Sequence, residues 1–247
     1  MQGVASESST FPRIVIKLSG EALAGQTGFG IDPAALSGLA MEIKTAVAEG
    51  IQIAVVLGGG NFLRGVTATA DGIDRVTADH MGMLATVINA LAFKQALQSQ
   101  GMIARIQSAI PMIPLVEPYL RDRTVKYLDS GAIVIFAAGT GNPCFTTDTA
   151  ASLRAIEIEA SLLLKATKVD GVYNRDPVTD PTATRYKTLS YDDILRDKLG
   201  VMDATAIALC RDYKLPLRVF NINEDGSLLR VVRGLDEGTL VTTEANQ

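Results

Sequence analysis

The sequence predicts an α/β fold, a three-layer αβα sandwich built around a mostly parallel β-sheet. Short runs rich in β-branched residues alternate along the chain with longer segments of helical period, which is the rhythm of βαβ units. The runs are apolar on consecutive residues, as in strands that are covered on both faces. A length of 247 residues suits one domain of this kind, because single hydrophobic cores stop growing near about 250 to 300 residues.

The elements follow one another within a single domain that we expect to span residues 13–247, after a polar tail at 1–12. Buried strands are expected at 13–20, 51–60, 102–109, 131–139, 161–168 and 215–222. Helices are expected between them at 33–49, 78–99, 148–158 and 203–213. Gly50 and Gly101 stand just past the first two helices, where glycine often ends a helix.

Two segments are candidates for a role beyond the fold itself. The helix at 78–99 has an apolar arc wider than one core-facing stripe requires, so it is either a buried core helix or one that also forms a subunit interface. Residues 174–190 contain Pro177 and Pro181 among aspartates and threonines and are interpreted as a long surface loop. Because loops of this length are uncommon and often functional, a flap over a ligand is a fair hypothesis.

The composition excludes several classes of protein. A net charge of -4 and a pI near 5.1 give no basic footprint for nucleic acid. Cys144 and Cys210 lack the spacing of a metal site, and we expect reduced thiols. Residues 1–12 lack the features of a signal peptide, and we find no run near the ~18 apolar residues of a membrane span. We therefore expect a cytoplasmic protein with no nucleic-acid or membrane partner.

Ligands bind outside the carboxyl ends of parallel strands, so the places where an apolar run gives way to glycine are candidate sites. Lys17 closes the first strand before Ser19 and Gly20, and its ammonium is either an ordinary surface charge or a contact for nucleotide phosphates. Residues 58–65 read GGGNFLRG, in which glycines allow close backbone approach to a phosphate and Arg64 offers a planar fork. A tight turn without a ligand explains them equally, and they match neither the Walker A nor the dinucleotide pattern.

A third candidate segment, 139–149, reads GTGNPCFTTDT and leads into a predicted helix. Thr146, Thr147 and Asp148 stand where an N-cap belongs, so capping alone accounts for part of the pattern. The same loop also offers the glycine, hydroxyl and amide groups that a base and a phosphate require at a helix N-terminus.

A fourth segment, 164–173, repeats the arrangement of a lysine near a strand end. Lys165 takes that place, and Asp170 and Tyr173 add a carboxylate and an aromatic ring that could hold a ribose and an adenine. A strand followed by a plain turn remains the alternative. The only histidine, His80, follows Asp79 without a nucleophile motif to partner it, which disfavours a catalytic triad.

Taken together, these segments resemble the bacterial uridylate kinases, a group within the amino-acid kinase fold family, from about Arg13 to Val241. The matching segments, in order and spacing, are KLSGEAL at 17–23, GFGID at 28–32, GGGN..RG at 58–65, DHMGMLAT at 79–86, AGTGNP.FTTD at 138–148, LKATKVDGVY at 164–173, DPTAT at 180–184 and VMD at 201–203. One departure is visible, since the motif usually has Phe where this chain has Cys144.

The resemblance implies a transfer of the γ-phosphoryl group from ATP, accompanied by Mg²⁺, to UMP. It places UMP on the N-terminal part of the chain and ATP on the part from about residue 164, without naming protein ligands of Mg²⁺. The residues it implies to be catalytic are Lys17, Lys165, Asp148, Arg64 and Asp203. Those it implies to bind ATP are Lys17, Leu18, Ser19, Gly20, Gly60, Arg64, Thr167, Tyr173 and Asp176. Those it implies to bind UMP are Gly59, Asp79, Thr140, Gly141, Asn142, Pro143, Cys144, Phe145, Thr146 and Thr147.

The resemblance also implies regulation and assembly. It gives UTP as an inhibitor, GTP as an activator and a homohexamer built as a trimer of dimers, in pyrimidine nucleotide biosynthesis. The stretch it links to GTP consists of Gly25, Gln26, Thr27, Gly28, Phe29 and Gly30. Three alternatives stay open: a kinase of this fold acting on a carboxylate or carbamate, a nucleotide-sensing module without catalysis, and an NAD-binding module.

Overall fold

The computed structural model describes residues 11–63, 72–177 and 179–244, and within these residues nine strands form one sheet. Across the sheet they lie in the order β4-β3-β5-β2-β1-β6-β8-β9-β7. Their bounds are β1 (Arg13–Leu18), β2 (Gln52–Leu57), β3 (Ala104–Ser108), β4 (Glu117–Pro118), β5 (Ile133–Ala137), β6 (Leu162–Thr167), β7 (Thr188–Ser190), β8 (Leu217–Asn221) and β9 (Thr239–Thr242). Neighbouring strands are parallel except β8 and β9, which run antiparallel. The predicted mostly parallel sheet is therefore confirmed.

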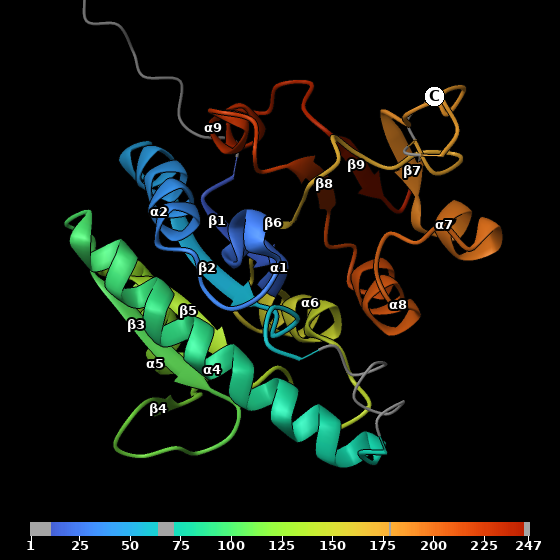
Figure 1. The fold of residues 1–247 in the computed structure, drawn as a ribbon. Coiled ribbons are helices and arrows are strands. Elements are labelled where there is room, and N and C mark those ends of the chain that lie inside the picture. Colours follow the sequence, from blue (N-terminus) through green and yellow to red (C-terminus); the bar gives the residue numbers. More distant parts are fainter. Residues whose placement is uncertain (1–10, 64–71, 178, 245–247) are drawn as a thin grey trace, which may run out of the picture.

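Helices cover both faces of this sheet (Figure 1). Their bounds are α1 (Gly20–Leu23), α2 (Pro33–Ala48), α4 (Arg75–Ser99), α5 (Arg121–Asp129), α6 (Thr147–Glu157), α7 (Tyr191–Asp197), α8 (Ala204–Asp212) and α9 (Ser227–Val232). One core layer joins Ile14, Ile16 and Leu18 of β1 to α2, α4 and α9. A second joins Val15 to α5, α6, α7 and α8 on the other face. The three-layer αβα sandwich is thus confirmed.

Local sequence explains where the principal helices start and stop. Asp32 caps α2 by accepting a hydrogen bond from the Ala34 N–H at 2.9 Å, with Pro33 in the first turn. Asp74 caps α4 through the N–H groups of Val76 and Thr77. Both helices end before a glycine in the left-handed region, at the two positions predicted, 50 and 101.

Helix α4 is the one helix among the described residues that is long and apolar enough to cross a membrane by composition. Its buried face, which includes Met83, Val87 and Phe93, packs into the core beneath the sheet. This packing accounts for the apolar residues on the buried face of α4, as expected for a core helix. The opposite side bears an exposed apolar stripe consisting of Met81, Leu84, Ile88 and Leu91.

The structure corrects several sequence predictions. Residues 174–190 are not loop throughout, because Thr188–Ser190 form β7 and pair with β9. Strands this short carry no readable periodicity, and neither β7 nor β9 was predicted. Helix α4 begins at Arg75, three residues before the predicted start, so Asp79 lies inside the helix. Helices α5, α7 and α9 and the short α1 were also missed, all of them nine residues or fewer.

Candidate active site

Lys17 and Lys165 occupy matching positions near the ends of two adjacent strands at the centre of the sheet. Lys17 of β1 pairs in register with Lys165 of β6. Because side chains alternate across a strand, Lys17 shares a face with Val15, and Lys165 shares one with Leu163. Both of these apolar neighbours pack in the core layer that contains α6. Parallel register therefore delivers two ammonium groups to the same face of the sheet, beside α6.

Asp148 receives both ammonium groups. It stands in the first turn of α6, and its Oδ1 lies 2.7 Å from Nζ of Lys17 while its Oδ2 lies 3.0 Å from Nζ of Lys165. Lys165 also donates to the carbonyl oxygen of Val201. All three charged side chains are largely buried. The carboxylate thus holds two cations at one edge of the sheet.

The pKa shifts of this cluster follow from burial and from charge. Burial disfavours the ionised form of Asp148, but the neighbouring charges of Lys17 and Lys165 outweigh it and hold the pKa of the carboxyl below its usual 3.8. Burial lowers the pKa of Lys165 below 10.5; the charge of Asp148 opposes this and that of Lys17 adds to it. With two lysines and one carboxylate, the cluster has a net positive formal charge that an anion can neutralise.

Asp203 ties the N-terminus of α8 to that of α6. Its Oδ1 caps α8 by accepting from the Ala206 N–H at 3.0 Å, and both carboxylate oxygens lie 2.9 Å from the hydroxyl of Thr149. The hydroxyl of Thr146 also donates to Asp203 and accepts from the N–H of Asp148 at 3.0 Å. Thr146 is therefore the predicted N-cap of α6. Thr149, which sequence reasoning missed, is a second link to Asp203.

The glycine-rich turn after β2 lies against the turn after β1. A Cβ atom at Gly20 would lie 2.5 Å from Oδ1 of Asn61 and 2.7 Å from the backbone nitrogen of Gly60. A Cβ atom at Gly59 would lie 2.6 Å from the carbonyl oxygen of Gly82 in α4. Glycine is required at positions 20 and 59 because backbone meets backbone there, so the turn packs tightly on both sides.

Two buried asparagines, also missed from sequence, fix the glycine-rich turn to α4. Nδ2 of Asn89 donates to the Gly58 carbonyl at 2.7 Å and to Oδ1 of Asn61 at 2.7 Å. Nδ2 of Asn61 donates to the Gly30 carbonyl at 2.7 Å and to Oδ1 of Asn89 at 2.9 Å. Asn89 follows Ile88 in an otherwise apolar stretch of helix, and a polar residue at such a position is the signal that could have revealed this pair.

The glycine-containing loop at 139–149 is also fixed to α4, through the residue that precedes it. The hydroxyl of Thr86 accepts a hydrogen bond from the N–H of Ala138 at 2.7 Å, at a residue with φ of 62°. Thr86 is buried and donates to the Met83 carbonyl within α4. One face of α4 thus positions both loops.

A cavity of about 300 Å³ lies between these loops and α4. Its lining includes six of the predicted UMP residues: Gly59, Asp79, Thr140, Phe145, Thr146 and Thr147. Gly60, predicted for ATP, also lines it. Asp79 accepts from Nε of Arg75 and, at 2.7 Å, from the backbone N–H of Cys144, so the carboxylate fastens the 140–147 loop to the helix. Four other predicted residues of the loop do not line this cavity: Gly141, Asn142, Pro143 and Cys144.

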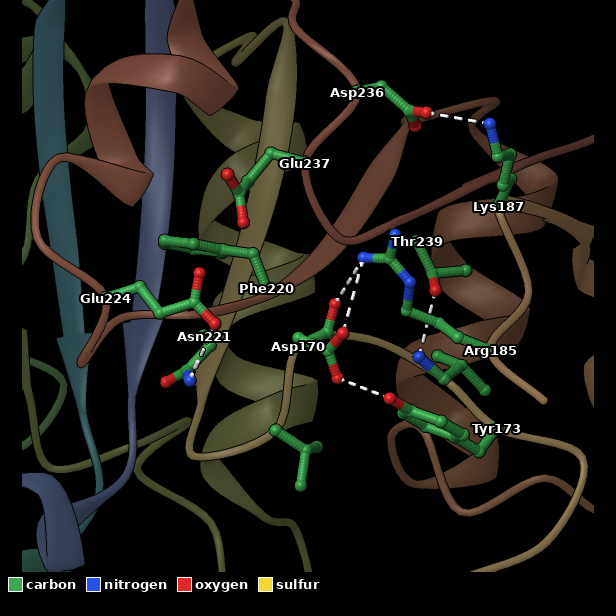
Figure 2. Close-up of polar contacts among 12 residues, drawn as sticks. Asp170, Tyr173, Arg185, Lys187, Phe220, Asn221, Glu224, Asp236, Glu237 and Thr239 are labelled. Atoms are coloured by element: carbon green, nitrogen blue, oxygen red, sulfur yellow. Dashed lines mark hydrogen bonds and ion pairs between the residues drawn. The ribbon is translucent and has the colours of Figure 1, made fainter. Parts of the chain in front are cut away.

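A second and larger cavity has a volume of about 520 Å³. Lys165, Thr167, Tyr173 and Asp176 line it, together with residues 197–201. Figure 2 shows Tyr173 beside Asp170, to which its hydroxyl donates at 2.6 Å. This hydrogen bond raises the pKa of Tyr173, so the phenol stays protonated.

The remaining predicted residues are placed as follows. Leu18 is a buried core residue, and Ser19 precedes α1 as its N-cap. In the stretch 25–30, Phe29 is 69% exposed and makes an edge contact with Phe62. Arg64 lies outside the described residues. Cys144 and Cys210 are free thiols, exposed and buried respectively.

The charged cluster links the walls of the two cavities. Thr147 lines the smaller cavity and is followed directly by Asp148, which pairs with Lys165 in the wall of the larger one. The arrangement can hold two anionic ligands with their charged ends facing one another at the two ammonium groups. It suits the transfer of an anionic group from one ligand to the other.

The chain is similar to known proteins in both sequence and structure. Residues 12–221 match the model of the amino acid kinase family. The structure is similar to that of a UMP kinase from Bacillus anthracis, with a TM-score of 0.92 and 43% identity over 95% of this chain and 97% of that one. It is also similar to a UMP kinase from Ureaplasma parvum, with a TM-score of 0.88 and 39% identity over 93% and 98%. A uridylate kinase from Archaeoglobus fulgidus matches with a TM-score of 0.69 and 27% identity over 93% and 99%.

Proposed function

The chain belongs to the amino acid kinase family, and we propose from this premise that it transfers the γ-phosphoryl group of ATP to UMP, forming ADP and UDP. The observation that carries the proposal is the convergence of Lys17 and Lys165 on Asp148 between two cavities. A single anionic substrate needs one cavity, whereas a phosphoryl donor and a phosphate acceptor need two that meet at a cationic centre.

UMP belongs in the smaller cavity. The carboxylate of Asp79 offers oxygen acceptors to ribose hydroxyls, and Gly59 and Gly60 offer backbone N–H groups near a phosphate. ATP belongs in the larger cavity, where Tyr173 gives an aromatic surface for adenine and Lys165 gives a cation for the phosphates. This division agrees with an N-terminal acceptor part and a donor part that starts near residue 164.

The chemistry is direct transfer between the two phosphates. An oxygen of the UMP phosphate attacks the γ-phosphorus of ATP, while the bond to the bridging oxygen of ADP breaks. Lys17 and Lys165 neutralise charge on the oxygens of the transferring group, and Asp148 holds both ammonium groups in place. The acceptor phosphate is already largely ionised at neutral pH, so the step needs no strong general base.

Mg²⁺ would enter with ATP. Among the described residues we find no group of three or more His, Cys, Asp or Glu side chains suited to a metal, and Asp148 and Asp203 are already paired with protein groups. Mg²⁺ commonly binds through substrate phosphates with few protein ligands, so this site fits the ion as a part of MgATP. When bound it would supply positive charge to the β- and γ-phosphates.

The exposed apolar stripe of α4 supports a homo-oligomer. Met81, Leu84, Ile88 and Leu91 are each 39% to 52% exposed, and their spacing of three, four and three residues places them on one side of the helix. A second copy of the chain packed on this stripe would bury it. Together with the family resemblance, this supports a homohexamer built as a trimer of dimers. By the same resemblance we extend the proposal to a cytoplasmic enzyme of pyrimidine nucleotide synthesis that GTP activates and UTP inhibits.

A coupled assay of ADP release tests the proposal. With ATP and Mg²⁺ present, UMP should support release at least about tenfold faster than CMP or dTMP. Cytosine reverses part of the hydrogen-bond pattern of uracil, and dTMP lacks the 2′-hydroxyl that Asp79 would hold, so each leaves polar groups of the site unpaired. Turnover with aspartate, glutamate or carbamate instead would identify a different kinase of this family. Nucleotide binding without release would identify a sensing module, and thermal stabilisation by NAD alone would identify a dinucleotide-binding protein.

A further inference from the structure

We infer that Arg185, which does not line the larger cavity, is a positioning residue that sets the shape of that cavity by fixing the segment from Asp170 to Tyr173. This inference rests on the proposed function only in taking ATP as the ligand of the cavity. It assigns to Arg185 a role in donor-nucleotide affinity and none in the transfer step.

Arg185 holds the segment at its first residue. Nη1 of Arg185 donates to the carbonyl oxygen of Asp170 at 2.9 Å and lies 3.7 Å from its Oδ2 (Figure 2). Asp170 in turn accepts from the hydroxyl of Tyr173 at 2.6 Å. The ion pair is long and partly exposed and contributes little by itself. The hydrogen bond from Arg185 to the Asp170 carbonyl is what fixes the position of Asp170. The carboxylate of Asp170 in turn fixes the ring of Tyr173 through its hydroxyl.

The stem of Arg185 fixes the next residue by contact. A Cβ atom at Gly171 would lie 2.8 Å from Cδ of Arg185 and 2.6 Å from the hydroxyl oxygen of Thr239. Gly171 is therefore enclosed between the two side chains. The hydroxyl of Thr239 accepts from the N–H of Val172 at 2.9 Å, which adds a fixed point on the β9 side.

The backbone then closes the arrangement. Tyr173 and Arg185 form an isolated antiparallel bridge, and the N–H of Tyr186 donates to the Val172 carbonyl at 2.8 Å. Residues 174–184, part of the predicted flap, begin and end at this bridge. Of these residues, Asn174, Asp176 and Pro177 line the cavity beside Tyr173. Moving Arg185 would consequently move the aromatic wall and the base of the flap together.

The test compares Arg185→Met with a matched control. Met keeps the aliphatic stem and removes the guanidinium. Lys187→Met is the control, because the Lys187–Asp236 ion pair lies in the same region at 2.9 Å but joins side chains that are 75% and 65% exposed (Figure 2). Both changes remove one positive charge. Thr239→Val, which deletes the hydroxyl that holds Val172, provides an independent route to the same segment.

We expect Arg185→Met to raise KM for ATP about tenfold, as the loss of one hydrogen bond from a charged donor does. We expect kcat and KM for UMP to stay within about twofold, because the transfer step and the acceptor are untouched. Thr239→Val should move KM for ATP in the same direction, and Lys187→Met should leave it unchanged. Calorimetric titration with ATP alone gives Kd for the same variants without turnover.

The possible outcomes are distinct. Equal effects of Arg185→Met and Lys187→Met would show a charge effect and overturn the inference. A matched fall of kcat with a rise of both KM values would show general disruption and also overturn it, and so would unchanged ATP affinity in Arg185→Met and Thr239→Val. If the wild type bound ATP without transferring to UMP, the proposed function would fail while the Kd comparison still decided the role of Arg185. A wild type that did not bind ATP would overturn both.

Discussion

The two cavities are held in different ways. The smaller one, where we place UMP, is enclosed by α4 and two turns, and its fixed points are buried: Asn61 with Asn89, Thr86, and the backbone contact at Gly59. The larger one, where we place ATP, is enclosed by loop segments at 167–177 and 197–201. Of its fixed points, Asp170 and Arg185 are partly exposed side chains, and Thr239 alone is buried.

The difference indicates how each substrate site tolerates change. Buried amides and backbone contacts leave few ways to relax, so substitutions around the smaller cavity should disturb folding and binding together. Partly solvated hydrogen bonds can be replaced by water, so substitutions around the larger cavity should mainly alter affinity. We place the lysine pair between the two substrates, so its loss should alter neither affinity as much as the rate of transfer.

The largest effect is expected at the lysine pair. Lys17→Met should lower kcat by on the order of 10² to 10³, because one charge-stabilising donor for the transferring group is lost. Steady-state kinetics with both substrates varied measures it, with KM values changing far less. A variant that turns over within about threefold of the wild type would show that Lys17 has no such role.

The next effect separates the two cavities. Gly59→Ala should lower kcat/KM for UMP about 100-fold, since its Cβ would meet the Gly82 carbonyl at 2.6 Å and the turn must shift. Binding of ATP alone should weaken much less. Gly38→Ala is the matched control, because Gly38 is an exposed α2 residue with open space around its Cβ position. Equal losses of UMP and ATP affinity in Gly59→Ala would remove the proposed contrast.

A third prediction concerns stability. Asn89→Ala removes the donor to Oδ1 of Asn61 and to the carbonyl of Gly58 in the core, which should lower the free energy of unfolding by about 2 to 3 kcal/mol. Gln95→Ala on the exposed side of the same helix should stay within about 0.5 kcal/mol. Urea denaturation of the three proteins measures the difference. Equal stabilities would mean that the buried pair does not fix the smaller cavity.

The smallest effect is on the pH dependence of kcat. Burial lowers the pKa of Lys165, so its ammonium loses the proton, and activity falls, at a pH below 10.5. In Asp148→Asn the carboxylate that raises this pKa is gone, so the alkaline limb should move to lower pH. Profiles of kcat at saturating substrates compare the two. A limb that moves to higher pH in the variant would contradict the assigned charge pattern.

Sequence alone predicted the fold and the proximity of the two lysines because these depend on long, simple patterns. Consecutive apolar runs marked the central strands, and the carboxyl ends of parallel strands lie at one edge, which brought Lys17 and Lys165 together. The Thr146 N-cap followed from local chemistry. These features require no knowledge of contacts between distant residues.

The parts that sequence did not predict depend on such contacts. Asn61 and Asn89 are 28 residues apart and pair only once α4 has packed against the turn. Arg185 reaches Asp170 across 15 residues, through a bridge too short to leave a periodic pattern. Strands β7 and β9 are recognisable as strands because they pair with one another. In each case the contact forms because of tertiary structure and not because of a local propensity in the sequence.

The central claim is that donor and acceptor are bound at the same time, with Lys17 and Lys165 between them. Initial rates of ADP formation over a grid of ATP and UMP concentrations test it most directly. Direct transfer predicts double-reciprocal lines that intersect, with no exchange between ATP and labelled ADP in the absence of UMP. Parallel lines accompanied by such exchange would show a phosphorylated enzyme intermediate and would contradict the account.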